Sequence, residues 1–269
     1  MYMLAALGFA FIFNMLGIIN FAHGSIYMLG AYICYTLVEA LCINSWLALF
    51  LTVIISFGIG LILERICFRP FVKDFTRVVM VCVAIIVISQ TTVNILAGTK
   101  TQAIRPFVLG TVSFLSQTIS LERVVTLAIG LCLLALIVFF VRRTTIGMQM
   151  EAIAQNRTGA ELQGIYVHRV SAYASVIGCA LAVIAGSLMG AYLTLTPSMG
   201  GTMLGKVLMV VMLAGAGSTG GIFITGLVVG GLDAILPIVL SGATSDAVAV
   251  GAIIVLLLIR PQGFFGHEA

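Results

Sequence analysis

The chain has 269 residues, of which 61% are hydrophobic and 8% charged, and its formal net charge is +4. Soluble domains carry about 25% charged residues, so this chain cannot cover itself with a polar surface, and much of its surface must face lipid. The composition gives no sign of nucleic-acid binding. Long unbroken apolar runs such as Val124–Val141 favour membrane-spanning helices over the alternating strands of a barrel.

A membrane-spanning helix needs about 20 mainly apolar residues. In chain order, the candidate runs are Tyr2–Ile19, Ser25–Leu41, Trp46–Leu63, Val78–Ala97, Val124–Val141, Val170–Leu195, Met203–Gly217, Ile222–Leu240 and Ala247–Ile259. The run Met203–Gly217 is short and ends in alternating Ala and Gly, so it is either a span or a re-entrant or broken helix. We therefore predict an all-α polytopic transmembrane bundle of about eight or nine spans with Gly-interrupted helices, forming one domain over residues 1–269.

Basic residues predict the orientation of this bundle. The polar breaks Glu64–Arg77 and Arg142–Arg169 each contain several Lys or Arg residues, and two predicted spans separate them. Because cytoplasmic loops are enriched in Lys and Arg, both breaks are expected in the cytoplasm. A nine-span count then places the N-terminus outside and the C-terminus inside.

Two Gly-containing segments interrupt the apolar runs and could line a substrate site. Between the first two apolar runs, Gly17–Gly24 includes Asn20 and His23, and Gly215–Gly221 lies near the other end of the chain. Broken helices in both halves of a transporter are typical of a substrate site at the membrane midplane. The alternatives are a short interfacial turn for the first segment and close helix packing for the second.

The break Arg142–Arg169 also predicts a short surface helix. Glu151 and Gln155 lie at i, i+4, as do Arg157 and Glu161, so each pair shares one helix face. Gly164 is suited to ending that helix. Such a polar helix between two spans suits docking into a cytoplasmic partner, and an ordinary solvated connection is the alternative.

Isolated charged residues, and the absence of known phosphate-binding and catalytic motifs from the sequence, narrow the functions that this chain can have. Asp233 lies well inside an apolar run and must face the bundle interior or take an internal partner, whereas Lys206 opens a run and is interpreted as reaching the interface. The sequence has no GxxxxGK[ST] phosphate loop and no GxSxG or HExxH motif. Its six cysteines lack CxxC spacing. We therefore expect no enzyme activity, no metal and no cofactor in this chain.

The segment Gly17–Tyr32 reads GIINFAHGSIYMLGAY and resembles the signature region of the branched-chain amino acid (LIV-type) ABC transporter permease family. Further matches follow in the order that the family has them, over nearly the whole chain. They are Glu64–Pro70, Gly205-Lys206, Gly226–Ala234 with Asp233 at the acidic position, and Pro261–Gly266.

This resemblance implies the membrane-spanning permease subunit of an ATP-driven ABC importer for branched-chain amino acids, in the bacterial cytoplasmic (inner) membrane. The implied partners are a second permease subunit (a copy or a paralogue), two cytoplasmic ATPase subunits that hold ATP and Mg, and a periplasmic or extracellular solute-binding protein. Permeases with this signature also carry urea, short amides or other amino acids. An ATP-independent channel or a secondary transporter, with Asp233 coupling ions, is the alternative outside this mechanism.

The resemblance also implies two candidate sites among the polar residues, a substrate pathway and a surface that couples to the ATPase. The expected substrate pathway contains Asn14, Asn20, His23, Thr194 and Asp233. Residues 142–169 become the coupling loop that docks into the ATPase, with expected contacts from Glu151, Ala152, Gln155, Asn156, Arg157, Glu161 and Gly164. The start of this loop resembles the importer motif EAAxxxG, except that Ile153 replaces the second Ala and Arg157 replaces the Gly.

Overall fold

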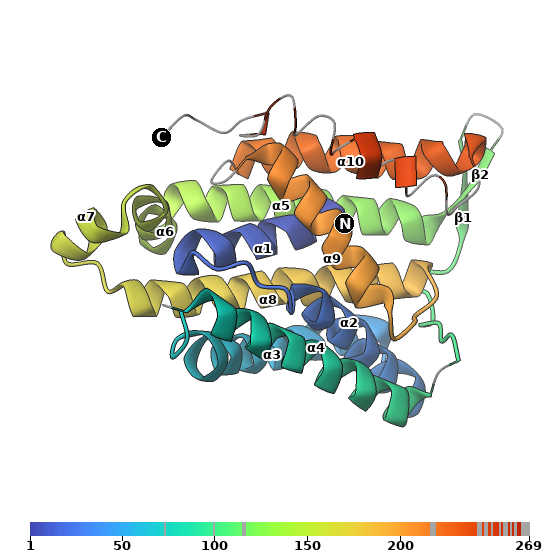
Figure 1. Cartoon of the computed structure of the whole chain (residues 1–269). Coiled ribbons are helices and arrows are strands. Elements are labelled where there is room, and N and C mark those ends of the chain that lie inside the picture. The colour runs from blue at the N-terminus through green and yellow to red at the C-terminus, as the bar shows by residue number, and fades with distance from the viewer. Residues whose placement is uncertain are drawn as a thin grey trace.

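The computed structural model describes residues 1–72, 74–98, 100–114, 117–215 and 219–240, with isolated positions beyond. Most helices run along one common direction (Figure 1). Their bounds are α1 Tyr2–Leu16, α2 His23–Tyr35, α3 Ser45–Ile62, α4 Phe75–Ala97, α5 Leu121–Arg143, α6 Thr145–Gln155, α7 Arg157–Leu162, α8 Val167–Tyr192, α9 Met199–Ala214 and α10 Thr219–Val239. Two π-helical turns, η1 (Thr36–Ala40) and η2 (Leu63–Phe68), extend α2 and α3.

Several of these helices are long and apolar enough to cross a membrane. Within the described residues they cover Ser45–Phe68, Phe75–Ala97, Leu121–Arg143, Val167–Tyr192 and Gly220–Ile238, and α1 and α9 are shorter apolar helices. The prediction of a polytopic helical membrane protein is confirmed. The predicted run Ala247–Ile259 lies partly outside the described residues, as does the end of Met203–Gly217, so a count of eight or nine spans stays a prediction.

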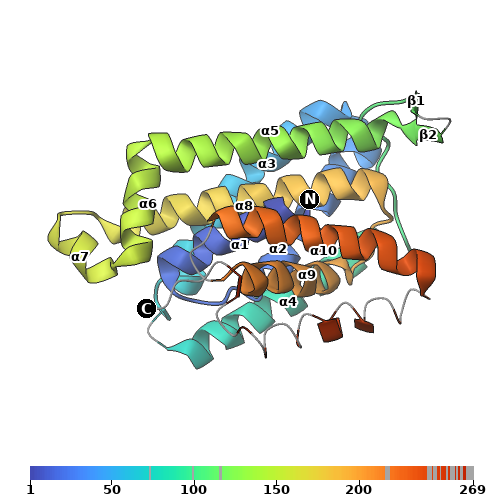
Figure 2. The same ribbon diagram turned by 90° about the horizontal axis from the view of Figure 1, so that it is seen from above.

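Helix α8 forms the centre of the bundle and packs against α1, α2 and α3. The apolar window of α8 is 72% buried, compared with 11% for α5, which runs along the outer edge in Figure 2. Small residues recur at every fourth position of α8, namely Ala174, Gly178, Ala182, Gly186 and Gly190. A Cβ added to Gly178 would lie 2.5 Å from the carbonyl oxygen of Gly8 in α1. This stripe therefore lets neighbouring helices approach closely, as small residues do in membranes.

The two ends of the bundle differ. Helices α6 and α7 project beyond the other helices at one end, where α4 begins and α5 ends, so both basic breaks lie at this end (Figures 1 and 2). A hairpin of β1 (Thr111–Phe114) and β2 (Gln117–Ser120) lies at the opposite end, with Thr111 paired to Ser120. This hairpin was not expected from the sequence, because its strands are short and polar.

Candidate functional site

The segment between α1 and α2 breaks an otherwise helical path. Gly17 ends α1 with a φ of 67°, a left-handed conformation that glycine adopts readily. The chain then passes through residues 18–22 before α2 begins at His23. Asn20 and His23 are each only 1% exposed, whereas Asn14, in the last turn of α1, is partly buried. The break therefore brings polar side chains into the protein interior.

These buried side chains contact neighbouring helices. The His23 ring donates through Nε2 to the carbonyl oxygen of Ala5 at 3.0 Å and packs edge-on against Phe9. Asn20 Oδ1 accepts from the thiol of Cys82 at 3.8 Å. Two further atoms, Asn20 Nδ2 and His23 Nδ1, have no hydrogen-bond partner in the described part of the chain. The contacts hold the broken segment against α1 and α4, and a role for these residues in the substrate pathway stays a prediction.

A charged cluster joins α1, α9 and α10. Lys206 Nζ forms an ion pair with Asp233 Oδ1, and the Tyr2 hydroxyl donates to Asp233 Oδ2 at 2.5 Å. Lys206 Nζ also lies 5.4 Å from the centroid of the Tyr2 ring. Asp233 therefore takes an internal partner, one of the two possibilities that its position allows.

This cluster faces a pocket of about 320 Å³. Thr194 and Asp233, two of the predicted pathway residues, line it together. Its other walls come mainly from apolar side chains of α8 and α9, including Met189, Met199 and Met203. The structure thus brings Thr194 and Asp233 to one site and leaves Asn14, Asn20 and His23 outside it.

Sequence reasoning missed Lys206 and Tyr2 as members of this site. Lys206 was interpreted as a residue that reaches the membrane interface, yet its side chain is only 22% exposed and pairs with Asp233. A usable signal was present, because Lys206 and Asp233 are the single charged residues of α9 and α10. Opposite charges on consecutive apolar helices favour an ion pair within the membrane.

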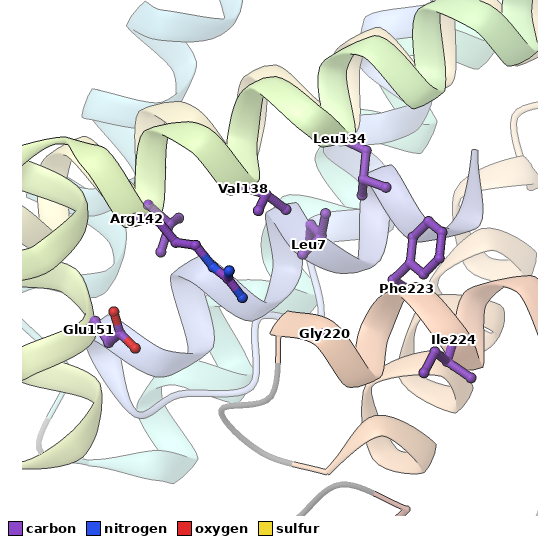
Figure 3. Close-up of a pocket in the computed structure, with 9 residues that line it drawn as sticks. Leu7, Leu134, Val138, Arg142, Glu151, Gly220, Phe223 and Ile224 are labelled. Atoms are coloured by element: carbon purple, nitrogen blue, oxygen red, sulfur yellow. The ribbon is translucent and has the colours of Figure 1, made fainter.

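A second pocket, of about 420 Å³, lies between α1, α5, α6 and α10. Leu7, Val138 and Phe223 contribute apolar walls, and Arg142 and Glu151 stand at the end nearest α6 (Figure 3). Glu151, one of the predicted coupling residues, therefore faces the gap between α5 and the rest of the bundle. Among the described residues, no group of three or more His, Cys, Asp or Glu is placed to hold a metal ion.

Helix α6 begins at a sharp corner directly after the end of α5 and runs across it (Figure 2). The Thr144 hydroxyl donates to the carbonyl oxygen of Phe140 at 2.7 Å and accepts from the Gly147 amide at 3.0 Å. A Cβ added to Gly147 would lie 2.5 Å from backbone atoms of Phe140 and Val141. The corner between α5 and α6 is therefore tightly packed.

The predicted single surface helix is divided into α6 and α7 at Asn156. Asn156 has an extended backbone, and its side chain accepts from the Gly159 amide at 2.8 Å, which caps the start of α7. Arg157 and Glu161 form the expected i, i+4 ion pair at 3.5 Å. Of the predicted coupling residues, the exposed ones are Glu151, Gln155, Asn156, Glu161 and Gly164, and the partly buried ones are Ala152 and Arg157.

Comparison with known proteins decides the family. The model of the branched-chain amino acid transport system permease component matches residues 1–258. The chain belongs to this permease family. It is 31% identical to the high-affinity branched-chain amino acid permease protein LivH of Salmonella typhimurium, over 99% of this chain and 91% of the relative. BraD of Pseudomonas aeruginosa is 30% identical over 99% of this chain and 92% of its own length.

A more distant relative is the probable branched-chain amino acid permease protein LivH of Methanocaldococcus jannaschii, which is 25% identical over 98% of this chain and 88% of its own length. No solved structure matches the chain. Membership of the permease family confirms the resemblance seen in Gly17–Tyr32. The chain is thus a multi-pass permease subunit of an ABC importer.

Proposed function

We propose that this permease subunit imports branched-chain amino acids, using ATP that separate cytoplasmic ATPase subunits bind with Mg and hydrolyse. The observation that carries the proposal is the projection of α6 and α7 from the end of the bundle where the basic breaks lie (Figure 1). The exposed polar face of this helix pair offers a docking surface to a motor outside the membrane. The names of the relatives LivH and BraD support branched-chain amino acids as the solute.

The proposed assembly contains two permease subunits, two ATPase subunits and a solute-binding protein on the outer side of a bacterial cytoplasmic membrane. The two permease subunits are copies of this chain or paralogues, and they form the pathway between them. Docking of α7 and the following turn into the ATPase would couple nucleotide binding to the orientation of the pathway, provided that the ATP-bound state favours one orientation.

A secondary transporter is less well supported, because its coupling carboxylate would have to exchange ions freely. Asp233 instead pairs with Lys206 and accepts from Tyr2. A lone proton or cation at Asp233 would have to compete with the Lys206 ammonium group, so we do not propose ion coupling.

The test is reconstitution of the complex in vesicles with its binding protein. We expect uptake of labelled leucine that requires ATP, is inhibited by vanadate and depends on copurifying ATPase subunits. Uptake by this subunit alone, without nucleotide, would show that the chain is a channel or a secondary transporter. Uptake of urea or acetamide in place of leucine would identify a different solute within the same family.

A further inference from the structure

The Lys206–Asp233 pair is not explained by stability alone. Charged side chains within a membrane are costly and usually mark functional positions. Replacing a buried ion pair by apolar residues of similar volume is often neutral or stabilising. The two side chains are also not fully enclosed, since Lys206 is 22% and Asp233 is 28% exposed. Both line the 320 Å³ pocket, so their charged ends are accessible to a small solute.

The shape and chemistry of this pocket suit a small amphipathic molecule. Its volume lies near the lower end of the range for ligand sites, about 300–1,000 Å³. One region carries a cation, an anion and the Tyr2 hydroxyl, and the other walls include Met189, Met199 and Met203. Methionine side chains are flexible and adapt to different apolar groups. The pocket thus offers opposite charges at one place and an adaptable apolar surface beside them.

We propose that Lys206 and Asp233 bind the charged ends of a zwitterionic α-amino acid. Lys206 takes the carboxylate, Asp233 takes the ammonium group, and the methionine-lined walls receive the aliphatic side chain. This inference rests on the proposed function as an importer subunit, and it specifies where in that subunit the solute is recognised. The Tyr2 hydroxyl, which donates to Asp233, positions the carboxylate for this contact.

Charge balance makes such a subsite selective. A zwitterion brings one positive and one negative group, so the internal ion pair opens and two new ion pairs replace it. A solute with only one charge compensates only one of the two charges of the opened pair in a low-dielectric site, which is strongly unfavourable. Urea and short amides carry neither charge and cannot replace the internal pair. The subsite therefore favours amino acids over the uncharged solutes.

The decisive experiment measures binding to the full membrane complex, without the solute-binding protein, which has its own selectivity. Labelled leucine is the probe. The competitors are unlabelled leucine, 4-methylpentanoate with only the carboxylate, 3-methylbutylamine with only the ammonium group, and urea. We expect each singly charged analogue to compete at least about tenfold less well than leucine, since a charge-assisted hydrogen bond contributes enough for that ratio. This comparison needs no variant and does not depend on any variant folding.

Two variants then assign the charges. Lys206→Met should weaken leucine binding by at least about tenfold and make 3-methylbutylamine as good a competitor as leucine, because the carboxylate has lost its partner. Asp233→Asn should do the same for 4-methylpentanoate. A purely structural ion pair would lower the amount of assembled complex without changing the order of the competitors. The matched control is the exposed pair Asp74–Arg77, whose removal by Asp74→Asn and Arg77→Met should leave leucine binding unchanged.

The outcomes separate this inference from the proposed function. Unchanged leucine binding in both variants overturns the subsite, as does equal competition by all analogues in the unaltered complex. ATP-driven leucine uptake without saturable binding to the membrane complex also overturns the subsite and leaves the proposed function standing. If the complete system imports no leucine, the proposed function itself fails.

Discussion

Gly24 of α2 and Gly200 of α9 touch backbone to backbone. A Cβ added to Gly24 would lie 2.0 Å from the carbonyl oxygen of Gly200, and one added to Gly200 would lie 2.6 Å from that of Gly24. Neither position accepts a side chain unless the helices separate. Gly24, which lies within the signature segment Gly17–Tyr32, therefore fixes α2, and the buried break before it, against the helix that carries Lys206.

The substitution Gly24→Leu should separate α2 from α9. We expect a loss of stability of about 1–3 kcal/mol or more, the usual cost of overpacking, seen as a lower Tm and a lower yield of the purified complex. The control is Gly201→Leu, because nothing lies within 4 Å of a Cβ at Gly201. Equal effects of the two substitutions would show that the close contact between α2 and α9 has no special importance.

Charge reversal in α7 tests the coupling surface. Arg157→Glu or Glu161→Arg should reduce ATP-driven leucine uptake about fivefold or more, since coupling between sites usually amounts to 1–3 kcal/mol. Assembly should survive, because an exposed ion pair such as Arg157–Glu161 contributes at most about 1 kcal/mol. Uptake in vesicles and copurification of the ATPase are the two measurements.

The control for these reversals is Asp74→Arg or Arg77→Glu, which alters another exposed ion pair outside α6 and α7. It should leave uptake close to that of the unaltered protein. If reversal at α7 has no more effect than the control, α7 does not transmit the motor's motion.

Removing the cap at Asn156 should loosen α7 alone. Asn156→Ala deletes the acceptor for the Gly159 amide, and loss of such a cap costs about 1 kcal/mol. Amide hydrogen exchange should accelerate in Arg157–Leu162, while α8 stays protected. Gln155→Ala, at an exposed neighbouring position, should not accelerate it. Unchanged exchange in the Asn156 variant would mean that α7 is held by its packing.

The corner between α5 and α6 is tested by Gly147→Val. The new side chain would clash with the backbone of Phe140 and Val141 and push α6 away from α5. We expect leucine uptake to fall while ATP hydrolysis continues, so that more ATP is consumed for each leucine imported. Ala154→Val places the same side chain at an exposed position of α6 and should leave this ratio unchanged. A normal ratio in the Gly147 variant would exclude α5 from the coupling route.

Most membrane-spanning helices were predictable, because a helix that crosses lipid needs a continuous run of apolar residues and such a run is visible in the sequence. The runs Trp46–Leu63, Val78–Ala97 and Val124–Val141 agree with α3, α4 and α5 to within a few residues. Helix ends were less predictable: α1 stops at Leu16 because Gly17 takes a left-handed conformation, although Ile18 and Ile19 continue the apolar run.

The candidate site was only partly predictable, because its contacts are tertiary. The apolar surroundings of Asp233 in the sequence indicated that it needs a partner. They did not identify that partner, because Lys206 lies on a different helix and Tyr2 lies near the other end of the chain. Asn occurs both inside helices and at their N-caps, so the sequence did not predict that Asn156 divides the surface helix into α6 and α7.

Helix α5 leaves nearly nine-tenths of its apolar window unburied, and it is joined to α6 by the Thr144 corner. The outer face of α5 is therefore left to acyl chains or to the second permease subunit of the proposed assembly. Packing against α5 in the membrane would then act on the same corner that joins it to the coupling helices.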